Sequence, residues 1–329
     1  MKAFAYLSPT TPEDAVKALA APGTVEALSG GTDLIGRMKD YVASPERVVY
    51  LKDVKALAGI VEKDGATAIG AGTRLVDLVS SATIRDRLPA LWQATTEVGT
   101  PQIRNMATVG GNLLQRPRCW YYRNGFGLLA MKDGKSLVRA GDNRYHAIFM
   151  TDGDALFVNP SSLAVPLIAL GATATILGPG GERTVPVEQL YRVPKADADR
   201  EQTLAPGELL AAVTVPAGVG KNASYEVRQK QAHDWPLVMT SVHLKMDGDS
   251  VREARVVLYG VAPIPWRSEA AEKAVVGGLV TRERAEAVAK AAAEGAKPLS
   301  NNGYKVALVR TTVKRALLSA VGDRYWQEG

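Results

Sequence analysis

The amino-acid sequence predicts an α+β protein, and three observations support this fold class. The first 220 residues contain two successive blocks in which strands, helices and a Gly-Gly turn follow one another. Beyond residue 220 the chain changes to alternating or apolar runs separated by turns, which is typical of an antiparallel meander. The 329 residues also exceed what a single compact core usually holds. We therefore predict two domains, residues 1–220 and 221–329.

The first block, about residues 1–55, is expected to form a strand–turn–helix–strand unit. Thr11 precedes Pro12 and two acidic residues, the pattern of a helix N-cap with proline at the first helical position. The other expected elements are a strand at 24–28, a turn at Gly30-Gly31, a short helix at 33–39 and a strand at 47–51. A unit of this kind favours parallel pairing of its two strands.

The second block, about residues 56–220, repeats the pattern with more helices. Its expected elements are a strand at 66–70, helices at 75–79 and 88–98, a glycine-rich loop at 109–112, an apolar helix at 162–170 and strands at 174–177 and 184–187. Residues 116–159 are the least patterned, so we expect an insertion with short hairpins there. Because each block contributes one Gly-Gly turn, we expect the two turns to hold a ligand between the blocks.

The C-terminal domain is expected to contain an antiparallel meander followed by helices. Predicted strands cover 225–229, 238–246 and 251–260, and Asp247-Gly248 is a favourable hairpin turn. Residues 268–318 are rich in alanine and have a helical period, with a break at 297–303.

The composition argues against several classes of protein. The net charge is +6, but basic residues are interspersed with acidic ones without a long basic run, so we do not expect nucleic-acid binding. No stretch approaches the roughly 18 apolar residues of a membrane span. The single cysteine, Cys119, excludes an internal disulfide, and the three histidines lack metal-ligand spacing, so we expect no metal site in this chain.

Two glycine-centred segments, residues 29–33 and 107–112, are the strongest indication of function. A pyrophosphate must be met by close backbone N–H groups, and glycine permits both the approach and the positive φ of a tight turn. The first segment ends a strand and begins a helix, so its amides can converge on an anion. We expect Asp33 to cap that helix, because a carboxylate repels phosphate. The Gly-x-Gly-x-x-Gly pattern of nicotinamide domains is absent after the first strand.

Both segments also resemble a known family. Residues 27–34, followed by Met38-Lys39, are similar to the first flavin motif in the FAD-binding (medium) subunits of molybdenum hydroxylases, which include the xanthine dehydrogenase family. Residues 102–113 resemble the second flavin motif of that family, and residues 206–216, 260–267 and 302–306 continue the resemblance in order along the chain. Residues 112–123 resemble the aldehyde oxidoreductase branch.

The resemblance implies a two-subdomain FAD-binding fold of the carbon monoxide dehydrogenase flavoprotein type, plus a C-terminal three-stranded antiparallel sheet with helices. It implies an oxidoreductase subunit in a heterotrimer. A large partner subunit with molybdopterin oxidises the substrate, and a small partner subunit with two [2Fe–2S] clusters delivers electrons to FAD. The FAD passes them to NAD⁺, oxygen, a quinone or another acceptor. A flavin that relays electrons needs no catalytic residue from this chain.

The resemblance further implies which residues bind FAD, without a covalent bond. Ser29, Gly30, Gly31 and Thr32 would meet one side of the pyrophosphate, and Thr108, Gly110, Gly111 and Asn112 the other. The remaining expected cofactor-binding residues are Asp33, Leu34 and Ala107 within the two segments, Ser162 beside the cofactor, Leu210 against the flavin ring and Lys230 near the edge of the ring.

Two positions depart from the family pattern. Relatives in the aldehyde branch carry four cysteines after the second motif, which bind a [4Fe–4S] cluster, whereas this chain has only Cys119. We therefore expect no such cluster here. Cys119 has two open interpretations, a small buried residue or a redox-sensitive thiol. Ser162 stands where relatives usually have an aspartate, which is expected to change flavin affinity or potential.

Two alternative functions remain open from the sequence. One is a flavin-free scaffold subunit of the same kind of complex, and the other is a stand-alone flavin oxidase, although no convincing acid–base pair is visible. The N-terminus lacks the apolar core of a signal peptide, so we expect a cytoplasmic protein. The alternative is a periplasmic location, reached by co-export with a partner that carries a twin-arginine signal.

Overall fold

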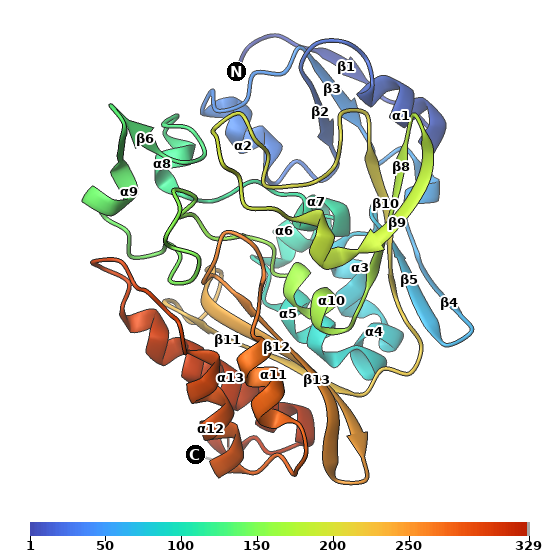
Figure 1. Cartoon of the computed structure of the whole chain (residues 1–329). Helices are drawn as coiled ribbons and strands as arrows, with labels where there is room; N and C mark the ends of the chain where they lie inside the picture. Colours follow the sequence, from blue (N-terminus) through green and yellow to red (C-terminus); the bar gives the residue numbers. More distant parts are fainter. Residues whose placement is uncertain (328–329) are drawn as a thin grey trace.

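The computed structural model describes residues 1–327 and contains three main sheets that follow one another from one end of the molecule to the other (Figure 1). The N-terminal sheet lies at the top of Figure 1, a five-stranded sheet lies on the right, and the C-terminal sheet with its helices lies at the bottom. The N-terminal sheet and the C-terminal helices lie at opposite ends.

The first sheet is parallel, as the sequence predicts. Its strands are β1 (Ala5–Leu7), β2 (Val25–Leu28) and β3 (Arg47–Tyr50), in the order β1-β3-β2. Helix α1 (Pro12–Leu19) begins as expected, because the Thr11 side chain accepts a hydrogen bond from the backbone N–H of Asp14. Helix α2 (Leu34–Lys39) follows the Gly-Gly turn.

The second sheet is antiparallel, with the order β4-β5-β10-β8-β9. These strands are β4 (Ile60–Lys63), β5 (Ala66–Gly70), β8 (Thr173–Gly178), β9 (Gly181–Pro186) and β10 (Leu209–Val215). Strand β10 lies between β5 and β8, which are distant from each other in the sequence. The expected strands of this block are confirmed, and β8 and β9 form a hairpin around Pro179 and Gly180.

Helices cover this sheet and form the largest core with it. They are α3 (Leu75–Ser80), α4 (Ala82–Arg87), α5 (Pro89–Thr96), α6 (Pro101–Met106), α7 (Val109–Leu113) and α10 (Ala164–Ala169), with 3₁₀ turns η1 (Lys55–Leu57) and η2 (Val187–Leu190). The prediction of a loop at residues 109–112 is wrong. Those residues form the short helix α7, because the Thr108 side chain accepts a hydrogen bond from Gly111 N–H and caps it.

The insertion contains one hairpin and two short helices. Strands β6 (Met131–Lys132) and β7 (Lys135–Ser136) form the expected hairpin. Helices α8 (Trp120–Arg123) and α9 (Leu137–Ala140) were not predicted, because each spans only about one turn and leaves no readable period.

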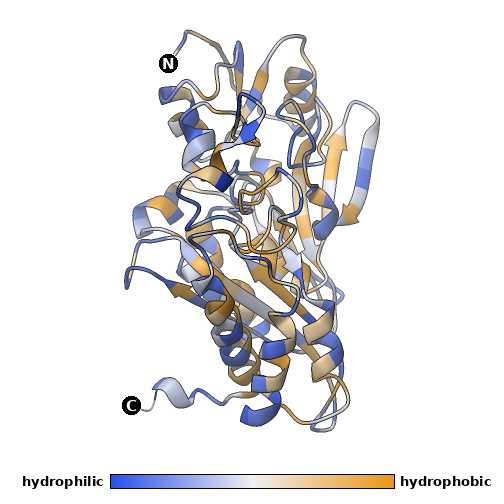
Figure 2. Cartoon of the chain, turned by 60° about the vertical axis from the view of Figure 1, so that its left-hand side comes forward, coloured by the Kyte–Doolittle hydropathy of each residue, from blue (hydrophilic) through white to orange (hydrophobic). Residues whose placement is uncertain are grey.

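The C-terminal sheet has four strands in the order β11-β12-β13-β14. They are β11 (Lys221–Arg228), β12 (Pro236–Asp247), β13 (Ser250–Tyr259) and β14 (Trp266–Arg267). The three long strands confirm the meander, and the two-residue β14 is an addition to the expected three. Helices α11 (Glu269–Val275), α12 (Arg282–Ala292) and α13 (Tyr304–Val321) pack with the sheet in one apolar core, and η3 (Tyr325–Gln327) follows them. Figure 2 shows apolar residues concentrated on these strands and helices.

Helix α5 joins the two halves of the molecule through hydrogen bonds to strand β11. The amide oxygen of Asn222 accepts from Ala90 N–H at 2.8 Å, and the Ser224 hydroxyl donates to the Ala90 carbonyl at 2.8 Å. These buried polar contacts fix the C-terminal sheet against the helices of the second block. Within residues 1–327, no helix combines the length and apolar character that crossing a membrane requires.

Candidate functional site

A cavity of about 810 Å³ lies where the first and second blocks meet. Its wall includes residues of the Gly-Gly turn after β2, the start of α7, the 200–210 segment and the beginning of β10. The volume falls within the range of about 300–1,000 Å³ that is typical of cofactor and small-molecule pockets. The two glycine segments therefore border one cavity, as the sequence predicts.

The two glycines of the first segment serve different purposes. Gly31 has a φ of +74°, a conformation that side chains with a Cβ rarely adopt. Gly30 is required by close packing, because a Cβ at this position would lie 2.1 Å from the carbonyl oxygen of Met106. The sequence argument assigned both glycines to the approach of a ligand. The structure instead uses Gly30 to bring the two segments against each other.

The backbone N–H groups of the first segment are available to a ligand. From Gly30 to Leu34, none of the five N–H groups donates a hydrogen bond to any residue of the described chain. All five residues line the cavity. Backbone N–H groups rarely stay unpaired in a folded protein. A run of five therefore indicates that an acceptor outside the chain pairs with them.

The second segment differs, because its N–H groups are already paired. The N–H groups of Val109 and Gly110 donate to the carbonyls of Thr73 and Ala71, and those of Gly111 and Asn112 donate to Thr108. The Thr108 hydroxyl also donates to the Ser29 hydroxyl at 2.9 Å. This segment therefore forms a wall that is attached to the first segment.

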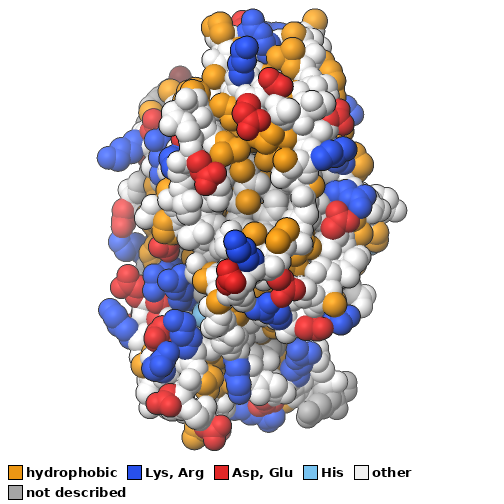
Figure 3. All heavy atoms as spheres, turned by 90° about the vertical axis from the view of Figure 1, so that its right-hand side faces the viewer, with side chains coloured by type: hydrophobic (Ala, Val, Ile, Leu, Met, Phe, Trp, Pro, Cys, Tyr) orange, Lys and Arg blue, Asp and Glu red, His pale blue; other side chains and the backbone are white. Residues whose placement is uncertain are grey.

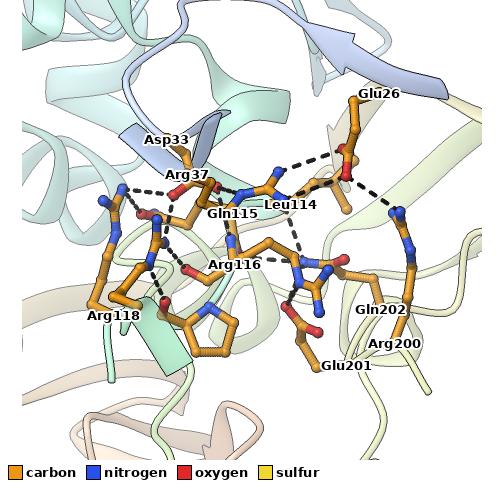
Figure 4. A network of polar contacts seen from close by, with 12 residues as sticks. Glu26, Asp33, Arg37, Leu114, Gln115, Arg116, Arg118, Arg200, Glu201 and Gln202 are labelled. Atoms are coloured by element: carbon orange, nitrogen blue, oxygen red, sulfur yellow. Dashed lines mark hydrogen bonds and ion pairs between the residues drawn. The ribbon is translucent and has the colours of Figure 1, made fainter. Parts of the chain in front are cut away.

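Asp33 is the centre of a buried network of arginines (Figure 4). Its carboxylate pairs with Arg37 at 3.2 Å, with Arg118 at 3.3 Å and with Arg123 at 2.7 Å. Burial raises the pKa of this carboxyl, but Arg118, Arg123 and Arg37 more than compensate and hold the pKa below its usual value. The expected cap is wrong, since the Asp33 side chain makes no hydrogen bond to the start of α2. Three arginines attract the carboxylate more strongly than a backbone N–H does.

The network extends to two further carboxylates, of which Glu26 lines the cavity. Arg116 pairs with Glu201 at 2.6 Å, and Glu26 accepts from both Arg37 and Arg200 at 3.4 Å. Five arginines thus meet three carboxylates in this network, and Arg37, Arg116 and Arg200 line the cavity together with Glu26 and Asp33. Sequence reasoning missed these residues, because the arginines come from three distant segments and form no motif.

Ten of the fourteen predicted cofactor-binding residues line the cavity. They are Ser29, Gly30, Gly31, Thr32, Asp33, Leu34, Thr108, Gly110, Gly111 and Leu210. Ala107, Asn112, Ser162 and Lys230 are not part of its wall. Lys230 is exposed at the turn between β11 and β12.

Asn112 does not line the cavity but holds the neighbouring segment 161–163 in place. Its side-chain oxygen accepts hydrogen bonds from the Ser161 hydroxyl at 2.9 Å and from Leu163 N–H at 3.1 Å. Asn112 therefore fixes the segment around Ser162, which is 3% exposed. Both residues support the wall of the cavity rather than face it.

Cys119 lies in the insertion beside a buried histidine. Its sulfur is 3.2 Å from His146 Nε2, and burial raises the pKa of the Cys119 thiol. A raised thiol pKa disfavours the reactive thiolate, which supports the interpretation as a small buried residue. Among residues 1–327, no group of three or more potential metal-binding side chains comes together.

Comparison with known proteins agrees with this geometry. Residues 2–218 match the family model described as the FAD-binding domain in molybdopterin dehydrogenase, and residues 223–320 match the CO dehydrogenase flavoprotein C-terminal domain. The chain belongs to the FAD-binding subunits of the molybdopterin dehydrogenase family. The chain is therefore an FAD-dependent oxidoreductase subunit, as the resemblance implied.

Individual relatives match over nearly their whole length. The chain is 31% identical to the FAD-binding subunit of aldehyde oxidoreductase from Escherichia coli, over 97% of this chain and 99% of the relative. It is 29% identical to the carbon monoxide dehydrogenase medium chain of Hydrogenophaga pseudoflava, over 96% of each. A solved structure of carbon monoxide dehydrogenase from Hydrogenophaga pseudoflava superimposes with a TM-score of 0.75 at 28% identity, over 97% of this chain and 98% of the other. The expected fold of the carbon monoxide dehydrogenase flavoprotein type is confirmed.

Proposed function

We propose that this chain is the FAD-binding electron-transfer subunit of a molybdenum hydroxylase complex. The observation that supports the cofactor assignment most directly is the run of five unpaired N–H groups from Gly30 to Leu34 in the wall of the cavity. These donors suit a pyrophosphate, whose oxygens accept hydrogen bonds.

The residues of the cavity have separate roles in this proposal. The N–H groups of residues 30–34 and the Thr32 hydroxyl hold the pyrophosphate. Thr108, Gly110 and Gly111 form the opposite wall, and Leu210, which is 2% exposed, packs against an apolar part of the cofactor. Ala107, Asn112 and Ser162 position the wall from behind. Lys230 lies outside the cavity, and we do not assign it a cofactor contact.

The proposal places the two domains and the partners as follows. Residues 1–220 bind FAD, residues 116–159 being an insertion, and residues 221–329 form the C-terminal domain of the flavoprotein. A large subunit with molybdopterin oxidises the substrate, a small subunit with [2Fe–2S] clusters delivers the electrons, and bound FAD supplies the redox chemistry that passes them on. This chain binds and orients the cofactor and contributes no acid or base.

The decisive experiment is to purify the full chain and to measure its flavin absorption spectrum before and after addition of FAD. We expect about one FAD per chain, bound without a covalent bond and released on denaturation. A chain that remains colourless with excess FAD, yet assembles with its partners, would instead be the flavin-free scaffold. A chain that alone consumes oxygen with an aldehyde would be the stand-alone oxidase.

The partners are tested by co-expression with the neighbouring reading frames. We expect affinity-tagged chain to retain a molybdopterin subunit and an iron–sulfur subunit. Cell fractionation of the same strain distinguishes a cytoplasmic complex from one that is exported with a partner carrying a twin-arginine signal.

A further inference from the structure

A second cavity, of about 190 Å³, lies between the insertion and the C-terminal domain. Its wall combines residues 118–120, 145–146, 157–158 and 160 with residues 234–237 at the start of β12 and with Tyr259 at the end of β13. None of the residues assigned to FAD lines it. Two separate parts of the chain thus enclose a space that the proposed function does not use.

The wall of this second cavity is rich in aromatic rings. The ring of Trp120 lies 5.4 Å from that of Tyr145 and 5.9 Å from that of His146, centroid to centroid. Phe157 and Trp235 also contribute to the wall. Flat aromatic surfaces of this kind favour a planar ligand, which packs against them face-on or edge-on.

The polar groups of the wall include hydrogen-bond donors without acceptors. The Tyr259 side chain is 4% exposed, and its hydroxyl makes no hydrogen bond to any described residue. Burial raises the pKa of Tyr259, so the hydroxyl keeps its proton. Arg118 Nε and His146 Nδ1 are also without a partner, but solvent does not reach these two atoms, and Nδ1 donates only in one tautomer. The Tyr259 hydroxyl is therefore the group that a ligand with an acceptor oxygen would pair.

Lys305 is a donor in the same wall whose hydrogen bonds are all made within the chain. This lysine also lines the cavity, but its ammonium donates to the carbonyls of Tyr145, His146 and Gly260 at 2.6–3.0 Å. Its hydrogen-bonding capacity is therefore filled by the chain itself. The Tyr259 hydroxyl, by contrast, has no hydrogen bond to a described residue.

The size of the cavity limits the ligand. A dry protein cavity of about 150 Å³ holds benzene, so about 190 Å³ suits one substituted ring or two fused rings. A dinucleotide such as NAD⁺ needs a pocket in the range of roughly 300–1,000 Å³. Oxygen would not need aromatic walls or donors. Of NAD⁺, oxygen and a quinone, only the quinone ring has this size, this planarity and a pair of carbonyl oxygens.

Arg118 connects this cavity with the larger cavity that is proposed to bind FAD, called the FAD cavity below. Its guanidinium pairs with Asp33, which lines the FAD cavity, at 3.3 Å. The same guanidinium lies 4.9 Å from the centre of the Trp235 ring, in the wall of the second cavity. One ion pair therefore links the walls of the two cavities.

We propose that the second cavity binds the quinone ring of the electron acceptor, with Tyr259 and Arg118 donating hydrogen bonds to its carbonyl oxygens. This proposal rests on the proposed function, because the electrons come from the flavin. The quinone takes two electrons and two protons from the reduced flavin and becomes a hydroquinone, while the flavin returns to its oxidised form. Tyr259 and Arg118 are binding residues in this step and are not consumed.

The first experiment measures binding, with menadione as the probe. Trp120 and Trp235 lie in the wall, so menadione should quench tryptophan fluorescence of the full chain in a saturable way. Isothermal titration provides a dissociation constant that is independent of optical artefacts. We expect Tyr259→Phe to weaken binding about three- to tenfold, the effect of one neutral hydrogen bond. Val158→Trp, which fills the cavity, should abolish it. Tyr6→Phe, a matched change at an exposed tyrosine, should leave it unchanged.

The second experiment measures electron transfer. The flavin of the full chain is reduced anaerobically and mixed with menadione in a stopped-flow instrument. The rate of flavin reoxidation should saturate at the menadione concentration that saturates binding, and Tyr259→Phe should shift both equally. Equal affinity in the wild type, Tyr259→Phe and Val158→Trp overturns the site. Binding without any effect of the variants on reoxidation overturns the role as acceptor site. A chain without flavin contradicts the proposed function instead, and the fluorescence titration still tests the cavity.

Discussion

The Thr108 hydroxyl donates a hydrogen bond of 2.9 Å to the Ser29 hydroxyl and thereby joins two segments that are 79 positions apart in the sequence. The same Thr108 oxygen accepts from Gly111 N–H at 3.2 Å, so it also caps helix α7. One side chain therefore both begins the second segment and attaches it to the first. The geometry of the FAD cavity depends on this contact.

Replacing Thr108 with valine should loosen the cavity. The change keeps the shape of the side chain but leaves Gly111 N–H and the Ser29 hydroxyl without this partner, at a cost of about 1–3 kcal/mol. We expect a lower melting temperature and weaker FAD binding by fluorescence titration. Thr108→Ser retains the hydroxyl and should stay close to the wild type. Equal melting temperatures for the valine and serine variants would contradict this role.

Gly30→Ala should disrupt the site more than its small size suggests. The new Cβ would lie 2.1 Å from the Met106 carbonyl oxygen, so the two segments must separate. We expect loss of most FAD from the purified chain, measured by the ratio of flavin to protein absorbance. Gly36→Ala is the matched control in α2, since its Cβ meets nothing within 4 Å. That variant should retain FAD and gain up to about 1 kcal/mol of stability.

Asp33→Asn should destabilise the chain strongly. Arg37, Arg118 and Arg123 would lose their shared carboxylate, and a buried ion pair broken on one side costs about 3–5 kcal/mol. Chemical denaturation monitored by circular dichroism measures this free energy of unfolding. The control is Asp77→Asn, which removes an exposed pair with Arg74 and should leave stability nearly unchanged. Similar losses in both variants would show that the network is not the cause.

Stability should fall in mild acid because of buried histidines. Burial, together with Lys245 and Arg255, lowers the pKa of His243 to about 4, from 6.5 in the unfolded chain. Below pH 6.5 the unfolded chain binds a proton that the native chain does not, so the free energy of unfolding decreases until about pH 4. For His243 the loss between pH 7 and pH 5 is about 2 kcal/mol.

Variants at two histidines test this pH dependence. His243→Gln should flatten the decrease in melting temperature between pH 7 and pH 5, since it removes the titrating ring. His146, whose pKa is also lowered to about 4 by burial and by Lys305, should behave similarly. His233 is exposed, so His233→Gln is the matched control for the same substitution at the surface. A wild-type slope in His243→Gln would assign the acid sensitivity to other groups.

Most secondary structure could be predicted because its signals are local. Thr11 and Pro12 start α1 through a capping hydrogen bond within one turn. Strands β12 and β13 are long, largely apolar runs on either side of a hairpin turn at Asp247-Gly248. The exception at α7 has a local reason as well. Gly110 and Gly111 have low helix propensity, and the cap from Thr108 overrides it.

On its own, the sequence determined the order of the elements, the two glycine segments and the family resemblance, because these depend on residues that are close together in the chain. Only the tertiary structure decided that Gly30 serves packing against Met106, that the N–H groups of α7 are occupied, and that five arginines converge on three carboxylates. It also decided that Arg118 reaches both Asp33 and Trp235. These contacts join residues tens to hundreds of positions apart, and their free energies depend on burial and distance, which no local pattern encodes.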